Sequence, residues 1–161
     1  MTKTKFQLAS GAAVVAALAG GALAGPLKDI GFFNTKDAKW APLDPKDTEG
    51  KGPQMSVVYG DPKAKGKPIA FFLKMPAGFK PGPHTHTSDY CALVVQGTLH
   101  DWKAPGTDEG PGVTVGNGWC QPGGQPHDNE CEAASKDGCV ALITSPGGFD
   151  FKPWTEPKAK K

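Results

Sequence analysis

The feature that most constrains the fold is the division of the chain into short apolar segments by clusters of glycine and proline. The 161 residues include 22 glycines and 16 prolines, which punctuate the chain between one apolar segment and the next. Val, Ile, Phe and Tyr are common in these segments and favour half-buried strands. No amphipathic helical repeat of useful length occurs outside the N-terminus, so the pattern predicts an all-β sandwich or barrel. The segments are Met55–Tyr59, Ile69–Met75, Tyr90–Val95 and Val140–Thr144.

The first 24 residues have the pattern of a secretory signal peptide. Lys3 and Lys5 precede an apolar run of small residues, which ends at the small-x-small cleavage pattern Ala22-Leu23-Ala24. The run is too short and too rich in Ala and Gly for a membrane span, so no stable membrane insertion is expected. We predict a secreted protein, most simply periplasmic. An uncleaved or lipid-linked membrane anchor is the alternative.

After the leader, the chain is long enough for a single domain with a hydrophobic core. Residues 25–52 are expected to form an irregular N-terminal arm with an edge strand near Trp40. Residues 53–151 contain the apolar segments and are expected to form the barrel. The lysine-rich residues 152–161 are expected to form a flexible C-terminal tail.

The charge pattern narrows the class of ligand. The chain has 18 basic and 16 acidic residues, and two of the lysines lie in the predicted leader, so the remainder is balanced. No basic face or aromatic-basic interleaving is present, which argues against nucleic-acid binding. None of the basic residues is an arginine. Because carboxylates and phosphates are usually held by a guanidinium fork, a small neutral ligand or substrate is favoured, although a lysine could act as a weaker point charge.

Three of the four histidines lie in two segments framed by Gly and Pro. His84 and His86 occur in residues 78–97, and His127 occurs in residues 116–131. An H-x-H pair in an extended strand presents both imidazoles on the same face, because side chains alternate along a strand. A third histidine from another strand on that face would complete a three-nitrogen site with open positions for a divalent transition metal.

These two segments resemble the motifs of the cupin superfamily, over roughly Met55 to Phe151. The first cupin motif, G-x5-H-x-H-x3-E-x6-G, is matched at Gly78, His84, His86 and Gly97. The second, G-x5-P-x-G-x2-H-x3-N, is matched at Gly116, Pro122, Gly124 and His127. Two positions differ, because Tyr90 replaces the glutamate and Cys131 replaces the asparagine. The chain also looks like a member of a poorly characterised subgroup of small single-domain cupins.

The resemblance implies a double-stranded β-helix, the jelly-roll barrel of cupins, with His84, His86 and His127 as metal ligands. Iron, zinc, manganese and copper are all compatible with such donors. A phenol is a poor ligand for most divalent ions, so Tyr90 is expected to act in catalysis, by orienting or protonating an intermediate. The alternative is a cupin that has lost its metal. His100, just after the first motif, is expected to be a surface or packing residue.

The four cysteines lie in the half of the chain that carries the motifs. In an exported protein, an even set of cysteines usually forms disulfides. In the implied jelly-roll, the strand that starts near Tyr90 lies antiparallel to the strand that ends near Cys120. That topology predicts the disulfides Cys91–Cys120 and Cys131–Cys139. The alternative is that one cysteine is a metal ligand or a redox thiol, with Cys131 the best candidate because it follows His127 by four residues.

Two classes of function fit these features. The first is an enzyme, a mononuclear metal-dependent dioxygenase, because the three-histidine arrangement resembles cupin dioxygenases that cleave diketone-like substrates. The second is a non-catalytic module that binds a metal or a small ligand, and isomerase or hydrolase chemistry with zinc or manganese is a further alternative. The expected partner is a small-molecule ligand or substrate, and a second copy of the chain in a homodimer is an open possibility. A fold alone does not choose between these functions.

Overall fold

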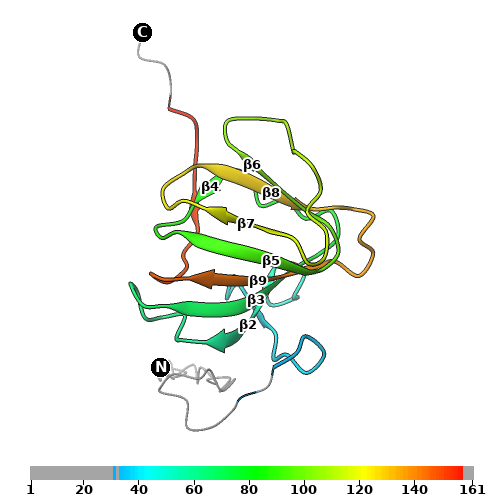
Figure 1. Ribbon diagram of the computed structural model, residues 1–161, viewed down its shortest axis with the longest axis vertical. Helices are drawn as coiled ribbons and strands as arrows, with labels where there is room; N and C mark the ends of the chain where they lie inside the picture. The colour runs from blue at the N-terminus through cyan, green and yellow to red at the C-terminus, as the bar shows by residue number, and fades with distance from the viewer. Residues whose placement is uncertain (1–30, 32, 158–161) are drawn as a thin grey trace, which may run out of the picture.

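The computed structural model describes residue 31 and residues 33–157, so the predicted signal peptide lies outside the described residues. The regular secondary structure of the described part is entirely β (Figure 1). Two antiparallel sheets form the molecule, which confirms the predicted all-β jelly-roll class. Among the described residues, no helix is long and apolar enough to cross a membrane.

The larger sheet has six strands in the order β1-β2-β3-β9-β5-β7. Four of them coincide with the apolar segments found in the sequence, because β-branched and aromatic side chains pack well on a pleated surface. The strands are β1 (Ala41–Pro42), β2 (Gln54–Tyr59), β3 (Ile69–Met75), β9 (Cys139–Ser145), β5 (Tyr90–Gln96) and β7 (Gly118–Gln121).

The smaller sheet has four strands in the order β10-β4-β8-β6. Two of them, β4 and β10, are only two residues long. The strands are β10 (Lys152–Pro153), β4 (His84–Thr85), β8 (His127–Cys131) and β6 (Leu99–Lys103). Figure 1 shows the C-terminal segment, in red, running past β4 at the side of the barrel.

The core lies between the sheets and consists mainly of side chains from the larger one. On β5, Tyr90, Ala92 and Val94 are buried, whereas Cys91 and Leu93 between them are exposed. This alternation is expected for a strand with one covered face. Phe71 on β3 and Ile143 on β9 are 0% and 2% exposed and pack in the same cluster.

Both ends of the described chain contribute a short strand to a sheet. Ala41 pairs with Met55 through β1, which confirms the edge strand expected near Trp40. Lys152 and Pro153, which fall in the predicted flexible tail, instead form β10 and pair with Thr85 and His84. The sequence did not reveal this strand because two residues are too few for a periodic signal.

The cysteines form Cys91–Cys120 and Cys131–Cys139, as predicted. The register of β5 and β7 places Cys91 directly opposite Cys120. Cys131 is therefore not available as a metal ligand, which removes that alternative. Close packing beside the second disulfide explains Gly97, which has a φ of 75° and where a Cβ would lie 2.9 Å from Cys139 Sγ. The two disulfides fit an oxidising, extracytoplasmic compartment.

Candidate metal centre

The three motif histidines meet inside the barrel. His84 and His127 are register partners on β4 and β8, so their side chains lie on the same side of the sheet. His86 follows β4 by one residue and, at a spacing of two from His84, shares its face. The three side chains are buried, and one ring nitrogen from each lies within 4.8 Å of the others. The structure thus brings together the predicted ligand set.

Backbone carbonyls hold the outer nitrogen of each imidazole. His84 Nδ1 donates to Gly82 O at 2.8 Å, and His127 Nδ1 lies 3.3 Å from Gln125 O. His86 Nδ1 donates to the carbonyl of Asp150. A proton on Nδ1 leaves the lone pair on Nε2, so each ring is neutral and presents a ligating nitrogen to the centre of the cluster. This donor set fits a divalent transition metal.

Burial keeps the three imidazoles in the form that binds metal. It lowers the pKa of His86 to about 4 and the pKa of His127 to about 3, and it also lowers the pKa of His84. Repulsion between the rings adds to the effect at His86 and His127. Desolvation disfavours a charged imidazolium, so protons compete weakly for the nitrogens near neutral pH.

Tyr90, which stands where the cupin motif has a carboxylate, points at the same cluster. Its hydroxyl donates to His127 Nε2 at 3.2 Å and accepts a hydrogen bond from Trp119 Nε1 at 3.3 Å. Burial, followed by the nearby charge of Asp101, raises the pKa of Tyr90 above its ordinary value. The side chain is therefore a neutral phenol that donates a hydrogen bond at the centre of the cluster and is a weaker acid than a free tyrosine.

A cavity of about 430 Å³ opens onto the histidine cluster. His84, His86 and Tyr90 line it at the cluster, while much of the remaining wall is aliphatic or aromatic. The apolar lining residues include Leu73, Met75, Phe79, Leu99, Ile143, Phe149 and Phe151. An apolar wall with a few convergent polar groups is the usual form of a small-molecule site.

Residues that the sequence analysis missed complete the cavity. Leu43, Asp44 and Pro45 of the N-terminal arm contribute to its wall, as do Phe149 and Phe151 near the C-terminus. These residues lie outside both motifs, and only the folded chain brings them to the histidines. The N-terminal arm therefore takes part in the site.

Asp101 is a further acid that the sequence analysis missed. It pairs in register with Asn129, which lines the cavity, so its side chain faces the barrel interior. Its Oδ1 is buried and has no hydrogen-bond partner among the described residues. Burial, together with the charge of Asp128, raises the pKa of Asp101 to about 7. Its position on β6 two residues after Leu99, a core residue, is the signal that could have revealed it.

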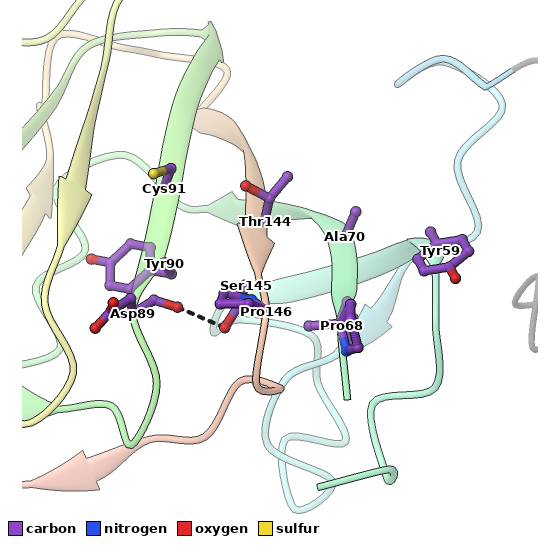
Figure 2. Close-up of a pocket in the computed structure, with 10 residues that line it drawn as sticks. Tyr59, Pro68, Ala70, Asp89, Tyr90, Cys91, Thr144, Ser145 and Pro146 are labelled. Atoms are coloured by element: carbon purple, nitrogen blue, oxygen red, sulfur yellow. Dashed lines mark hydrogen bonds between the residues drawn. The ribbon is translucent and has the colours of Figure 1, made fainter. Parts of the chain in front are cut away.

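A second hollow, of about 420 Å³, lies on the outer side of the larger sheet. Figure 2 shows Ala70, Thr144 and Cys91 beside it, while the ring of Tyr90 points away from them. Ser145 Oγ donates to the carbonyl of Asp89 at its edge. None of the three clustered histidines lines this hollow, so the candidate chemistry belongs to the interior cavity.

The two antiparallel sheets and the buried histidine cluster define a cupin-like fold, and comparison with solved structures supports this class. KdgF from a Halomonas species aligns with a TM-score of 0.53 and 22% identity over 72% of this chain and 94% of its own. An RmlC-like cupin from Ralstonia eutropha gives a TM-score of 0.58 at 18% identity over 76% and 72%. The polyketide cyclase RemF from Streptomyces resistomycificus gives 0.58 at 16% identity over 81% and 89%.

The chain belongs to the family described as a domain of unknown function, DUF4437, which matches residues 32–158. The match covers both histidine motifs and extends to either side of the predicted barrel, over part of the arm and over β10. A search of curated proteins found no match.

Proposed function

We propose that the protein is an exported, metal-dependent cupin enzyme that acts on a small, uncharged and largely apolar organic molecule. The observation that supports this proposal most directly is the convergence of three buried, neutral imidazoles at an apolar cavity. His84, His86 and His127 would hold one divalent transition metal through their Nε2 atoms. Bound there, the ion would supply Lewis-acid or redox chemistry to a ligand in the cavity.

The cavity wall supports an uncharged substrate. Among the described residues no lysine lines the cavity, and the chain contains no arginine, so a carboxylate or phosphate group would find no cationic side chain there. Asp44, in the N-terminal arm, is the acidic residue of the lining. A flat organic molecule of modest size, with an oxygen near the histidines and an apolar body against Phe149 and Phe151, would match these surfaces.

Within this class we propose oxygen-dependent cleavage of a neutral diketone-like molecule as the specific reaction. Three histidines without a carboxylate leave positions around the metal for both the substrate and dioxygen. A metal on His127 Nε2 would displace the hydrogen bond that the Tyr90 hydroxyl donates to this atom, and Tyr90 would then donate a hydrogen bond to an oxygen of the substrate. The cyclase among the structural neighbours illustrates that the cupin fold carries other reactions as well.

Metal content and oxygen uptake test the proposal together. Protein purified from its native compartment is expected to hold one transition metal ion per chain by elemental analysis. Iron-loaded protein is expected to consume oxygen with at least one member of a panel of neutral diketones and to fail with the matching carboxylic acids. Zinc alone at full occupancy would contradict the iron-dependent reaction. Protein that holds no metal at all would contradict the proposal of a metal-dependent enzyme.

A non-catalytic metal- or ligand-binding module is the second candidate. It is favoured by the scarcity of acid–base groups in the cavity lining, where Tyr90 and Asp44 are the ionisable side chains besides the histidines. This hypothesis would be favoured if the protein held stoichiometric metal and a tightly bound small molecule but did not turn that molecule over, with or without oxygen. Secretion to the periplasm belongs to the proposal in either case and is supported by the two disulfides.

A further inference from the structure

The segment that follows β9 crosses the histidine cluster. Phe149 stacks on His86 with ring centroids 4.3 Å apart and an angle of 30° between the planes. Phe151 stacks on His84 at 4.5 Å and 26°. A spacing of two residues in an extended segment places both rings on the same side, so two ligating imidazoles each lie against one phenylalanine.

Asp150, between the two phenylalanines, ties this segment to the end of β4. Its carbonyl accepts the hydrogen bond from His86 Nδ1. Its carboxylate accepts two bonds from Thr87, one from the backbone N–H at 2.6 Å and one from the hydroxyl at 2.5 Å. Lys152 Nζ lies 3.3 Å from the same carboxylate and donates to Thr87 Oγ1 at 2.6 Å. Although burial acts in the opposite direction, these bonds hold the pKa of Asp150 below its ordinary value.

The smaller sheet alone gives little support to the first two histidines. β4 is two residues long and meets β8 at a single register pair, His84 with His127. His86 lies beyond the end of β4, outside the ladder of that sheet, and its backbone carbonyl is held instead by the N–H of Gly124 at 2.8 Å. The other neighbour of β4 is β10, which belongs to the same C-terminal segment. The segment therefore supplies much of the packing and hydrogen bonding that orients both rings.

We propose that residues 149–153 form a strap that holds His84 and His86 in their ligating orientation, with Asp150 as the positioning residue that fastens it. This inference rests on the proposed metal-binding function and identifies what makes the site competent. Outer partners of metal-bound histidines fix the ring orientation and the position of its proton, and their loss typically weakens metal binding by about 10–100-fold.

Cobalt(II) binding to the full chain tests the strap, because the visible spectrum of cobalt reports the geometry of its ligands. Asp150→Ala is expected to weaken cobalt binding by about 10–100-fold and to change the spectrum. Asp150→Asn keeps an acceptor for the Thr87 N–H and is expected to restore binding to within about threefold. Asp61→Ala is the matched control: it also removes a carboxylate that accepts a backbone N–H, that of Lys63 at 2.8 Å, but it lies outside the strap and the cavity lining, so a change of no more than about threefold is expected.

Unfolding of the metal-free variants by denaturant separates positioning from a purely structural role. If Asp150→Ala lowers the unfolding free energy but the folded protein binds cobalt with the wild-type Kd and spectrum, the strap proposal is wrong. Failure of the wild type to bind cobalt would instead contradict the proposed function. In that case hydrogen exchange of the metal-free protein tests the strap: Asp150→Ala should speed exchange at the Thr87 amide and leave the Val94 amide in the larger sheet unchanged. Equal protection of Thr87 in both proteins would overturn the strap.

Discussion

The two sheets of the barrel differ in strand length and in the chemistry of their inward side chains. In the larger sheet, β3, β5 and β9 are seven residues each and pair along nearly their whole length. Their inward side chains are mostly apolar. In the smaller sheet, β4 and β10 have two residues each, and inward positions carry the histidines, Asp101 and Asn129. The polar site lies where backbone pairing is shortest, so its geometry depends on side-chain bonds and on the strap.

The largest expected effect is the loss of the metal from the smaller sheet. His84→Ala removes one of three ligands and should weaken metal binding by more than about a hundredfold, beyond the usual range for outer partners. His100→Ala is the control, because His100 lies outside the cluster and its buried Nδ1 has no partner among the described residues. Metal per chain after dialysis measures both variants, and equal loss in the two would reject the ligand set.

Truncation of a core side chain in the larger sheet is expected to lower the stability of the protein. Phe71→Ala deletes a side chain that is 0% exposed and should lower the unfolding free energy by about 3–5 kcal/mol, because the cavity left behind cannot fully collapse. Val115→Ala, at a side chain that is 60% exposed, should change it by less than about 0.5 kcal/mol. Denaturant unfolding of the disulfide-intact proteins measures both. Similar stability of the two variants would mean that the larger sheet is not the main source of stability.

Asp101, in the smaller sheet, should make the stability of the protein fall as the pH rises toward neutral. Its pKa of about 7 in the folded chain exceeds the ordinary value of 3.8, so the folded state binds more protons than the unfolded state between those values. Its contribution to stability is therefore lost as pH rises from about 4 to about 7, by roughly 1–4 kcal/mol.

Asp101→Asn should remove this loss and should be more stable than the wild type at pH 8 by a similar amount. Urea unfolding of wild type and variant at pH 4.5 and pH 8 measures the difference. The comparison between the two proteins cancels the opposite contribution of the three histidines, whose lowered pKa values reduce stability as pH falls below about 6.5. Parallel pH profiles would contradict the burial of this carboxylate.

The smallest expected effect is the response of metal affinity to mild acid. Because the pKa values of His86 and His127 lie near 4 and 3, these rings are already neutral at pH 6. The pKa of His84 is also lowered from 6.5, so protonation of this ring costs less than about fourfold at pH 6, and metal affinity should fall by less than about fourfold between pH 8 and pH 6. Three histidines with the ordinary pKa near 6.5 would lose roughly seventyfold at pH 6. Isothermal titration across this range distinguishes the two cases.

The sequence was informative where the signal is local. The apolar segments located β2, β3, β5 and β9, and the spacing of His84 and His86 placed both rings on one face. The cysteine pairs also followed once the jelly-roll order was inferred, since Cys91 and Cys120 lie on neighbouring antiparallel strands. Each of these inferences depends on residue type and on a period of two along a strand.

Other parts of the site carry no such signal. Asp150 lies 64 residues from His86 in sequence, yet its carbonyl holds that ring. Phe149 and Phe151 lie at the end of the predicted barrel, outside the apolar segments and both motifs, and the two-residue β10 is too short for a pattern. Asp101 was missed because an acid in a strand is usually solvated, and only its register with Asn129 shows that it faces inward.

By itself, the sequence determined the fold class, the strands of the larger sheet and the set of imidazoles, because these follow from apolar alternation and from motif spacing within one segment. The tertiary structure alone decided which groups surround the imidazoles: the apolar cavity, the inward acid Asp101 and the strap fastened by Asp150. The physical reason is that ring orientation and pKa depend on burial and on partners distant in the chain, and those partners meet only when the two sheets close on each other.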